Sequence, residues 1–153
     1  MMHDRYQRGV ALLESLVSMV VLAIGLLGMA ALLTYSMKSM GKAQYAAQAT
    51  YAAQMIASAI FAQEANNLAG LNALNGNTTA GTYSGHTAID QALTAWSSYT
   101  QANLPAGTGI LSVTAPGGTG ACNMLPCQVT VTMGWNGADH VPQSYQTSLI
   151  MGY

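Results

Sequence analysis

One apolar run, from Val10 to Leu33, constrains the fold of this chain more than any other feature. A run of this length can cross a bilayer as a helix. Its one charged residue is Glu14, and Ser15 and Ser18 are its other polar positions. An ionisable residue at mid-membrane costs about 2.5–3.5 kcal/mol and less near an interface, so it usually has a partner or a function. The sequence therefore predicts a membrane helix whose single carboxylate has a role.

The residues around the run leave its type and its orientation open. Within it, Gly28-Met29-Ala30 has the small-x-small form of a signal-peptide cleavage site. The run is nevertheless longer than the usual apolar core of about 7–15 residues, and it contains Glu14. Two basic residues precede it and two follow it, which is a tie under the positive-inside rule. An ordinary signal peptide, a permanent signal anchor and a membrane helix behind a cleaved leader are the competing interpretations.

Charge is sparse and unevenly placed in this chain of 153 residues. The basic residues are Arg5, Arg8, Lys38 and Lys42. From Ala43 onward the charged residues are the acids Glu64, Asp90 and Asp139. Such a surface lacks the basic patch that gives nucleic-acid-binding proteins their phosphate affinity, so we expect no nucleic-acid partner. Its weak electrostatic repulsion suits a subunit that packs against neighbours.

Cys122 and Cys127 are the two cysteines of the chain. Their spacing is too wide for a redox C-x-x-C motif, and no second Cys or His pair stands at zinc-ligand spacing. A disulfide is expected if this region lies outside the cytosol, and the pair in turn favours that location. Closing so short a loop contributes about 2 kcal/mol in the chain-entropy model. Two reduced, half-buried cysteines are the alternative.

The region after the apolar run predicts two further helical segments. Residues 34–68 lack proline and are rich in Ala, Gln and Met, which favours a continuing helix. Its apolar face consists of Tyr45, Ala49, Ala53, Ile56 and Ile60, which recur at helical spacing. Residues 66–85 are dense in Asn, Gly and Thr and are interpreted as a loop. Beyond that loop, Thr87 caps a helix over about 88–102, whose apolar side carries Ile89, Leu93, Trp96 and Tyr99.

Three runs near the carboxyl end predict strands, at 109–115, 128–135 and 144–151. In the second run Val129, Val131, Met133 and Trp135 alternate with polar residues. One apolar face per strand suits an antiparallel sheet laid on the long helix. The fold class expected from the sequence is therefore α+β.

Side chains that could support catalysis are scattered. The histidines are His3, His86 and His140, without ligand spacing within a helix. The pair Asp139-His140 follows the turn signal Asn136-Gly137 and is interpreted as a solvated turn. Gly117-Gly118-Thr119-Gly120 lacks the Lys-Ser/Thr of a phosphate loop. We therefore expect no enzyme, no metal and no cofactor.

The start of the chain resembles a known processing signal. Arg8-Gly9-Val10-Ala11-Leu12-Leu13-Glu14 is similar to the type III signal of type IV prepilins, in which a basic leader ends in Gly and the fifth mature residue is Glu. The resemblance implies that prepilin peptidase cuts after Gly9 and that the new amino group of Val10 is N-methylated. That family most often has Phe where this chain has Val10. The run from Ser15 to Gly28 resembles PilV-type minor pilins in particular.

That family resemblance implies a pilin-like layout, in which a long amino-terminal helix packs on a small antiparallel sheet domain. The expected divisions are a leader (1–9), a transmembrane and assembly helix (10–33), its periplasmic continuation (34–68) and a small globular domain with one helix and about three strands (69–153). After cleavage, the carboxylate of Glu14 in one subunit can meet the amine of Val10 in the next, so that each offsets the desolvation of the other. The alternative is a Glu14 side chain that reaches water near the headgroups.

The resemblance also implies a function. The expected protein is a minor pilin that helps to initiate type IV pilus assembly, at the tip, together with other minor pilins and the major pilin. It would be held in inner-membrane lipid by a single span, with its carboxyl-terminal domain in the periplasm, and would enter the pilus after assembly. Rival interpretations are a minor pseudopilin of type II secretion, a filament-displayed adhesin or DNA-uptake pilin, and a signal-anchored domain that is never processed.

Overall fold

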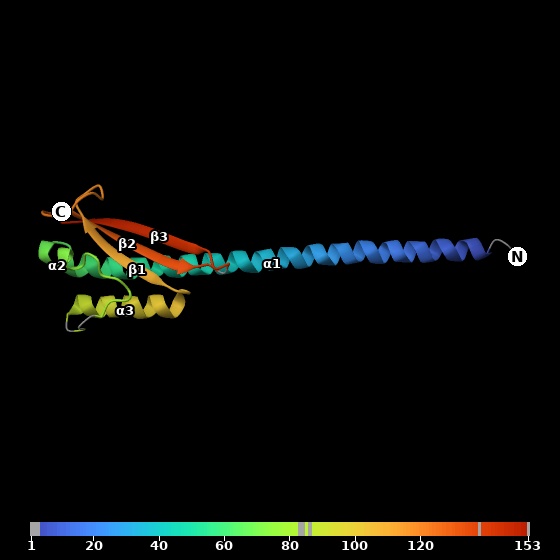
Figure 1. Ribbon diagram of the computed structural model, residues 1–153, viewed down its shortest axis with the longest axis horizontal. Coiled ribbons are helices and arrows are strands. Elements are labelled where there is room, and N and C mark those ends of the chain that lie inside the picture. Colours follow the sequence, from blue (N-terminus) through green and yellow to red (C-terminus); the bar gives the residue numbers. More distant parts are fainter. Residues whose placement is uncertain (1–3, 83–84, 86, 138, 153) are drawn as a thin grey trace. The chain divides into compact units, whose positions relative to one another are not determined.

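The computed structural model describes the backbone of residues 4–82, 85, 87–137 and 139–152, and the side chains of those residues from Leu12 onward. The elements are α1 (Asp4–Glu64), α2 (Leu68–Ala73), α3 (Ala88–Asn103), β1 (Thr108–Thr114), β2 (Cys127–Asn136) and β3 (Pro142–Met151) (Figure 1). The chain divides into two compact units, Met1–Met40 and Gly41–Tyr153. A long helix packed on a three-stranded antiparallel sheet confirms the expected α+β, pilin-like layout.

Two serines in the first unit hydrogen-bond to the backbone of α1 itself. The hydroxyls of Ser15 and Ser18 donate to the carbonyl oxygens of Leu12 and Glu14, at 2.9 and 2.8 Å. A hydroxyl bonded within its own helix needs no partner from the surroundings, so it is tolerated among apolar residues. Neither Ser15 nor Ser18 therefore adds an unpaired hydroxyl to the apolar surface.

The part of α1 in the second unit buries one face. Ala49, Ala53, Ile56 and Ile60 are fully buried, and Tyr45 is half-buried against them. This is the face predicted from the 3–4-residue spacing. Ala52 and Ala57 are also buried on this side, and the small side chains of the four alanines let the helix pack closely on its neighbours.

The sheet has the order β1-β2-β3, with both neighbouring pairs antiparallel. Its register aligns Leu111 of β1, Val131 of β2 and Thr147 of β3 across the strands. The alternation predicted for the second run is confirmed, because Val129 and Val131 are fully buried on one face of β2. All three strands begin and end within two residues of the predicted runs. This inner face and the helices together enclose the core.

Helix α3 packs on the inner face of β1. It begins where predicted, because the Thr87 hydroxyl accepts a hydrogen bond from the backbone N–H of Asp90 at 3.1 Å. Leu93 and Trp96 are buried on its core side. Gly109 lies directly under the Trp96 ring, and a β-carbon at this position would collide with the ring. The glycine therefore makes the close packing of α3 on β1 possible.

Residues 66–85 are more structured than the loop that their composition predicts. They contain α2, and α1 ends at Glu64 rather than near Leu68. The side chain of Asn67 caps α2 by accepting from the N–H of Gly70 at 3.1 Å. Leu71 is fully buried in the core. A helix of six residues is too short to leave a periodic pattern, and the tertiary burial of Leu71 stabilises it instead.

Candidate functional site

The residues of the expected processing signal all lie on α1. Gly9 and Val10 fall in its first turns, and their side chains lie outside the described residues. Glu14 follows Val10 by four positions, which places the two on the same side of a helix. The Glu14 side chain is exposed, and its carboxylate has no ion pair among the side chains described from Leu12 onward. Glu14 is thus a carboxylate in an apolar helix with no ion-pair partner among the described side chains.

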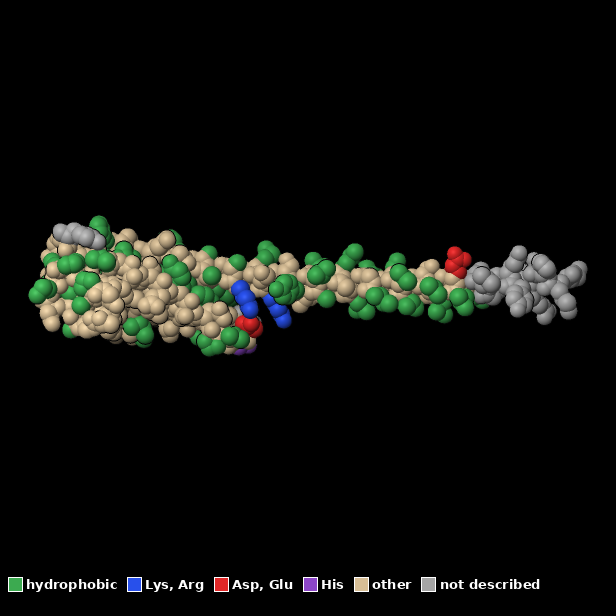
Figure 2. Space-filling model, turned by 90° about the horizontal axis from the view of Figure 1, so that it is seen from above, with side chains coloured by type: hydrophobic (Ala, Val, Ile, Leu, Met, Phe, Trp, Pro, Cys, Tyr) green, Lys and Arg blue, Asp and Glu red, His purple; other side chains and the backbone are tan. Residues whose placement is uncertain are grey.

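Hydrophobic side chains are spread along the rest of this stretch of α1 (Figure 2). Between Leu12 and Met40 every large apolar side chain is at least 49% exposed. Of the described helices, α1 is the one long and apolar enough to cross a membrane, with a mean hydropathy of 2.6 in its best window. Gly25 and Gly28 have open space where a β-carbon would be, so another helix can approach them closely. Such a surface suits a lipid environment or contact with other apolar helices.

An ion pair joins α1 to the β2–β3 turn within the second unit. The Lys42 ammonium donates to Oδ2 of Asp139 at 2.9 Å, with both side chains partly exposed. This hydrogen bond from Lys42 holds the pKa of the Asp139 carboxyl below its ordinary value. The sequence correctly predicts a turn here, where His140 adopts a left-handed φ of 59°. The sequence does not reveal the pairing, because Lys42 and Asp139 are far apart along the chain.

Cys122 and Cys127 form a disulfide in the structure. Both cysteines are buried, at 2% and 0% exposure, and they belong to the core of the second unit. Between them Met124 is 75% exposed. The bridge therefore closes a loop whose ends are fixed in the core and whose tip faces solvent.

One comparison with known proteins finds a match. The family model described as the prokaryotic N-terminal methylation motif matches residues 4–30. No curated protein and no solved structure matches the chain. The matched segment contains Gly9, Val10 and Glu14, and it covers all but the last three residues of the apolar run that ends at Leu33. The motif supports a type IV prepilin-like chain.

The motif and the apolar helix are both consistent with the same general type of protein. An amino-terminal apolar helix that carries the motif fits a single-pass, membrane-anchored chain of the pilin and pseudopilin type. The motif also implies processing by prepilin peptidase and assembly with other pilins. The motif indicates a structural protein of the pilin type.

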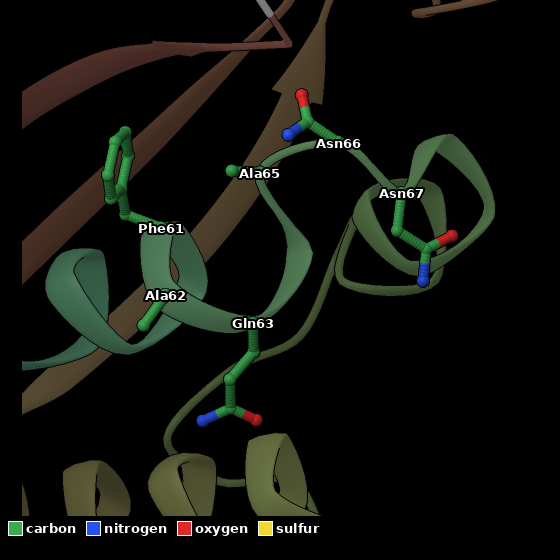
Figure 3. Close-up of a pocket in the computed structure, with 6 residues that line it drawn as sticks. All are labelled: Phe61, Ala62, Gln63, Ala65, Asn66 and Asn67. Carbon is green, nitrogen blue, oxygen red and sulfur yellow. The ribbon is translucent and has the colours of Figure 1, made fainter.

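A hollow of about 570 Å³ lies on the second unit where α1 gives way to α2 (Figure 3). Its lining residues are Phe61, Ala62, Gln63, Ala65, Asn66 and Asn67. The side chains of Phe61, Gln63 and Asn66 point in different directions. The Asn67 amide is already engaged, since its Nδ2 donates to Oε2 of Glu64 at 2.7 Å. The hollow therefore lacks a set of polar groups that converge on one ligand atom.

The remaining candidates for chemistry stay apart. His3 and His86 lie outside the described residues, and His140 lies in the β2–β3 turn. Among the side chains that the structure describes, no group of three His, Cys, Asp or Glu residues is placed to hold a metal ion. The candidate functional residues that remain are Gly9, Val10 and Glu14 of α1, which lie within the matched motif.

Proposed function

We propose that this chain is a minor pilin of a type IV pilus, similar to the PilV type, and that it takes part in the initiation of pilus assembly at the tip. It is made as a prepilin and held in the inner membrane by residues 10–33, with its carboxyl-terminal domain in the periplasm. Prepilin peptidase cuts after Gly9, and Val10 is then N-methylated. The observation that carries the proposal is the methylation motif at residues 4–30, with Glu14 at the fifth position after the cleavage site.

The mechanism of assembly follows from two charges in an apolar setting. Cleavage leaves a positive amine on Val10 at the end of an apolar helix, and Glu14 supplies an exposed carboxylate four residues later. In a bundle of staggered parallel helices, the carboxylate of one subunit meets the amine of the next. The pairing offsets the cost of placing each charge among apolar side chains, and it fixes the axial stagger of the subunits.

The state of the mature amino terminus tests the processing step. Mass spectrometry of the protein from cells with active prepilin peptidase should show a chain that begins at N-methylated Val10. An intact Met1 terminus under the same conditions contradicts the proposal and favours a signal-anchored domain that is never processed.

The carboxylate of Glu14 tests the assembly step. Glu14→Ala and Glu14→Gln should both leave the protein in the inner membrane and exclude it from sheared pili, because both lack the charge that meets the amine. Ser15→Ala is the matched control, since the Ser15 hydroxyl bonds to its own helix. Incorporation of Glu14→Gln at the level of the control would show that the charge has no role.

A minor pseudopilin of type II secretion is the second candidate, because the same motif and the same helix are shared by that class. Deleting the gene separates the two functions. Loss of surface pili with normal secretion supports the pilin, and loss of secreted enzymes with normal pili supports the pseudopilin.

A further inference from the structure

Four buried polar atoms of the second unit have no hydrogen-bond partner among the described residues. Three of them are the indole nitrogens of Trp96 and Trp135 and the hydroxyl oxygen of Thr100, and these residues are at most 7% exposed. The fourth is the side-chain carbonyl oxygen of Gln48, a half-buried residue of α1. Buried polar groups in folded proteins are bonded either to protein or to ordered water, because an unpaired one is costly.

Trp96 and Thr100 stand one turn apart on the core side of α3. The Trp96 ring lies over Gly109, and the carbonyl oxygen of Thr100 lies where a β-carbon of Gly107 would be in contact with it. Side chains four residues apart on a helix are neighbours, with about 5–6 Å between their Cβ atoms. Both residues therefore border the start of β1.

The end of β2 brings the second indole to the same place. Gly134 is opposite Thr108 in the register of β1 and β2, and the N–H of Asn136 donates to the carbonyl oxygen of Pro105 at 2.9 Å. Trp135, between these two positions, therefore lies beside the start of β1. Its side chain is buried on the inner face of β2, so both indoles lie on the core side of the sheet.

Helix α1 supplies the fourth atom. The rings of Tyr51 and Tyr99 are in contact, with centroids 5.1 Å apart. Within the second unit α1 and α3 run in opposite directions (Figure 1). The turn of α1 before Tyr51, which contains Gln48, therefore lies beside the turn of α3 after Tyr99, which contains Thr100. All four atoms thus belong to the end of the core where α3 and β2 end and β1 begins.

We propose that a buried water molecule binds among these four atoms. It accepts from the indole N–H groups of Trp96 and Trp135, and it donates to Oγ1 of Thr100 and Oε1 of Gln48. An indole N–H can only donate and a carbonyl oxygen can only accept, whereas water does both. Two to four polar partners are usual for a buried water. This inference concerns the core of the second unit and does not depend on the proposed function.

An ion does not suit the site. The two indoles and the hydroxyl could donate to an anion, but a buried anion without a compensating cation is costly. Lys42 is the one basic residue of the second unit, and it is partly exposed and paired with Asp139. A cation is disfavoured in turn, because an indole N–H offers it no lone pair. A neutral ligand that both donates and accepts remains.

Nuclear magnetic resonance of the full-length, ¹⁵N-labelled chain in detergent tests the site directly. The chain has two tryptophans and hence two indole N–H signals, which Trp135→Phe assigns. Each signal should show a cross-peak at the water frequency whose sign reverses between the NOESY and ROESY spectra, as a direct contact with a long-lived water requires. The absence of both cross-peaks would overturn the proposal. Cross-peaks of the same sign in the two spectra would overturn it as well, because they report only proton exchange with solvent.

Removal of the Thr100 hydroxyl gives an independent test. Thr100→Val keeps the side-chain shape, but the water loses a partner, so the unfolding equilibrium constant should rise about two- to tenfold. The water cross-peak of Trp96 should weaken in the same variant. If the hydroxyl instead has no partner in the folded chain, valine removes an unpaired buried group and stabilises the fold. An unfolding constant that is unchanged or lower would therefore overturn the proposal.

The matched control is Thr114→Val. Its hydroxyl is also buried without a partner, but strand alternation places Thr114 on the outer face of β1, away from the two indoles. This variant should keep both water cross-peaks and should not raise the unfolding constant. Loss of the cross-peaks in Thr114→Val would place the water elsewhere and contradict the proposed site.

Discussion

The two stretches of α1 differ both in composition and in the burial of their apolar side chains. From Leu12 to Met40 the large apolar side chains are all exposed, whereas from Ala49 to Ile60 one face is fully buried. The first stretch is apolar on every side, and the second is apolar on one side only. A helix that is apolar all round needs lipid or other helices, and a helix with one apolar face needs a domain. The apolar side chains from Leu12 to Met40 are therefore left for contact with lipid or other molecules, whereas those from Ala49 to Ile60 belong to the core of the chain's own domain.

The largest expected effect tests the core of the second unit. Trp96→Ala should lower the free energy of unfolding by about 3–5 kcal/mol, because Trp96 is fully buried between α3 and β1. Denaturant unfolding of the full chain, followed by the fluorescence of Trp135, measures this loss. Leu22→Ala on the exposed stretch is the control and should leave the transition unchanged. An equal loss of unfolding free energy in Trp96→Ala and Leu22→Ala would show that the exposed stretch of α1 contributes to the core as much as the buried residues do.

A charge in the exposed stretch tests its membrane environment. Leu22→Lys should make insertion less favourable by about 2.5–3.5 kcal/mol, because Leu22 lies near the middle of the apolar run. The fraction of protein that resists carbonate extraction from membranes should fall. Phe61→Lys, at an exposed position near the end of the same helix, should extract like the wild type. A Leu22→Lys variant as resistant as this control would mean that Leu22 does not face lipid.

Removing the disulfide measures how much the closed loop contributes to the stability of the second unit. Cys122→Ser combined with Cys127→Ser should lower the free energy of unfolding by about 2 kcal/mol, the chain-entropy value for a short loop. Wild-type protein in reducing agent should show the same loss. Met124→Ala changes the exposed tip of that loop and should have no measurable effect. If reduction leaves the unfolding midpoint unchanged, the buried cysteines stabilise the core by packing alone.

The smallest effect concerns the Lys42–Asp139 pair. The folded-state pKa of Asp139 is lowered, so its contribution is complete above the unfolded-state value of about 3.9 and is lost as pH falls through the folded-state value. The melting temperature of Asp139→Asn should therefore lie slightly below wild type near pH 7 and converge with it below about pH 4. Lys42→Gln should reproduce the difference near neutral pH. A gap that persists in acid would assign the effect of Asp139 to its turn rather than to the ion pair.

Much of the fold could be predicted because its signals are local. The helical face through Ile56, the cap at Thr87 and the alternation around Val131 depend on neighbours within a few residues. These patterns follow from the periods of the helix and the strand. The processing signal is equally local, since Gly9, Val10 and Glu14 stand within one short segment that the methylation motif also matches.

Other features depend on contacts between distant segments, and the sequence alone does not contain their geometry. α2 forms because the core buries Leu71, and Lys42 meets Asp139 because the sheet brings the β2–β3 turn to α1. Likewise, residues 75–79 cover β1 while β3 stays open, although both strands carry similar uncharged residues. The sequence by itself determined the apolar helix, its carboxylate and the alternating strands, because backbone geometry translates local spacing directly. Only the tertiary structure decided which edge is closed and which charges pair, because those outcomes require segments far apart in the chain to share one core.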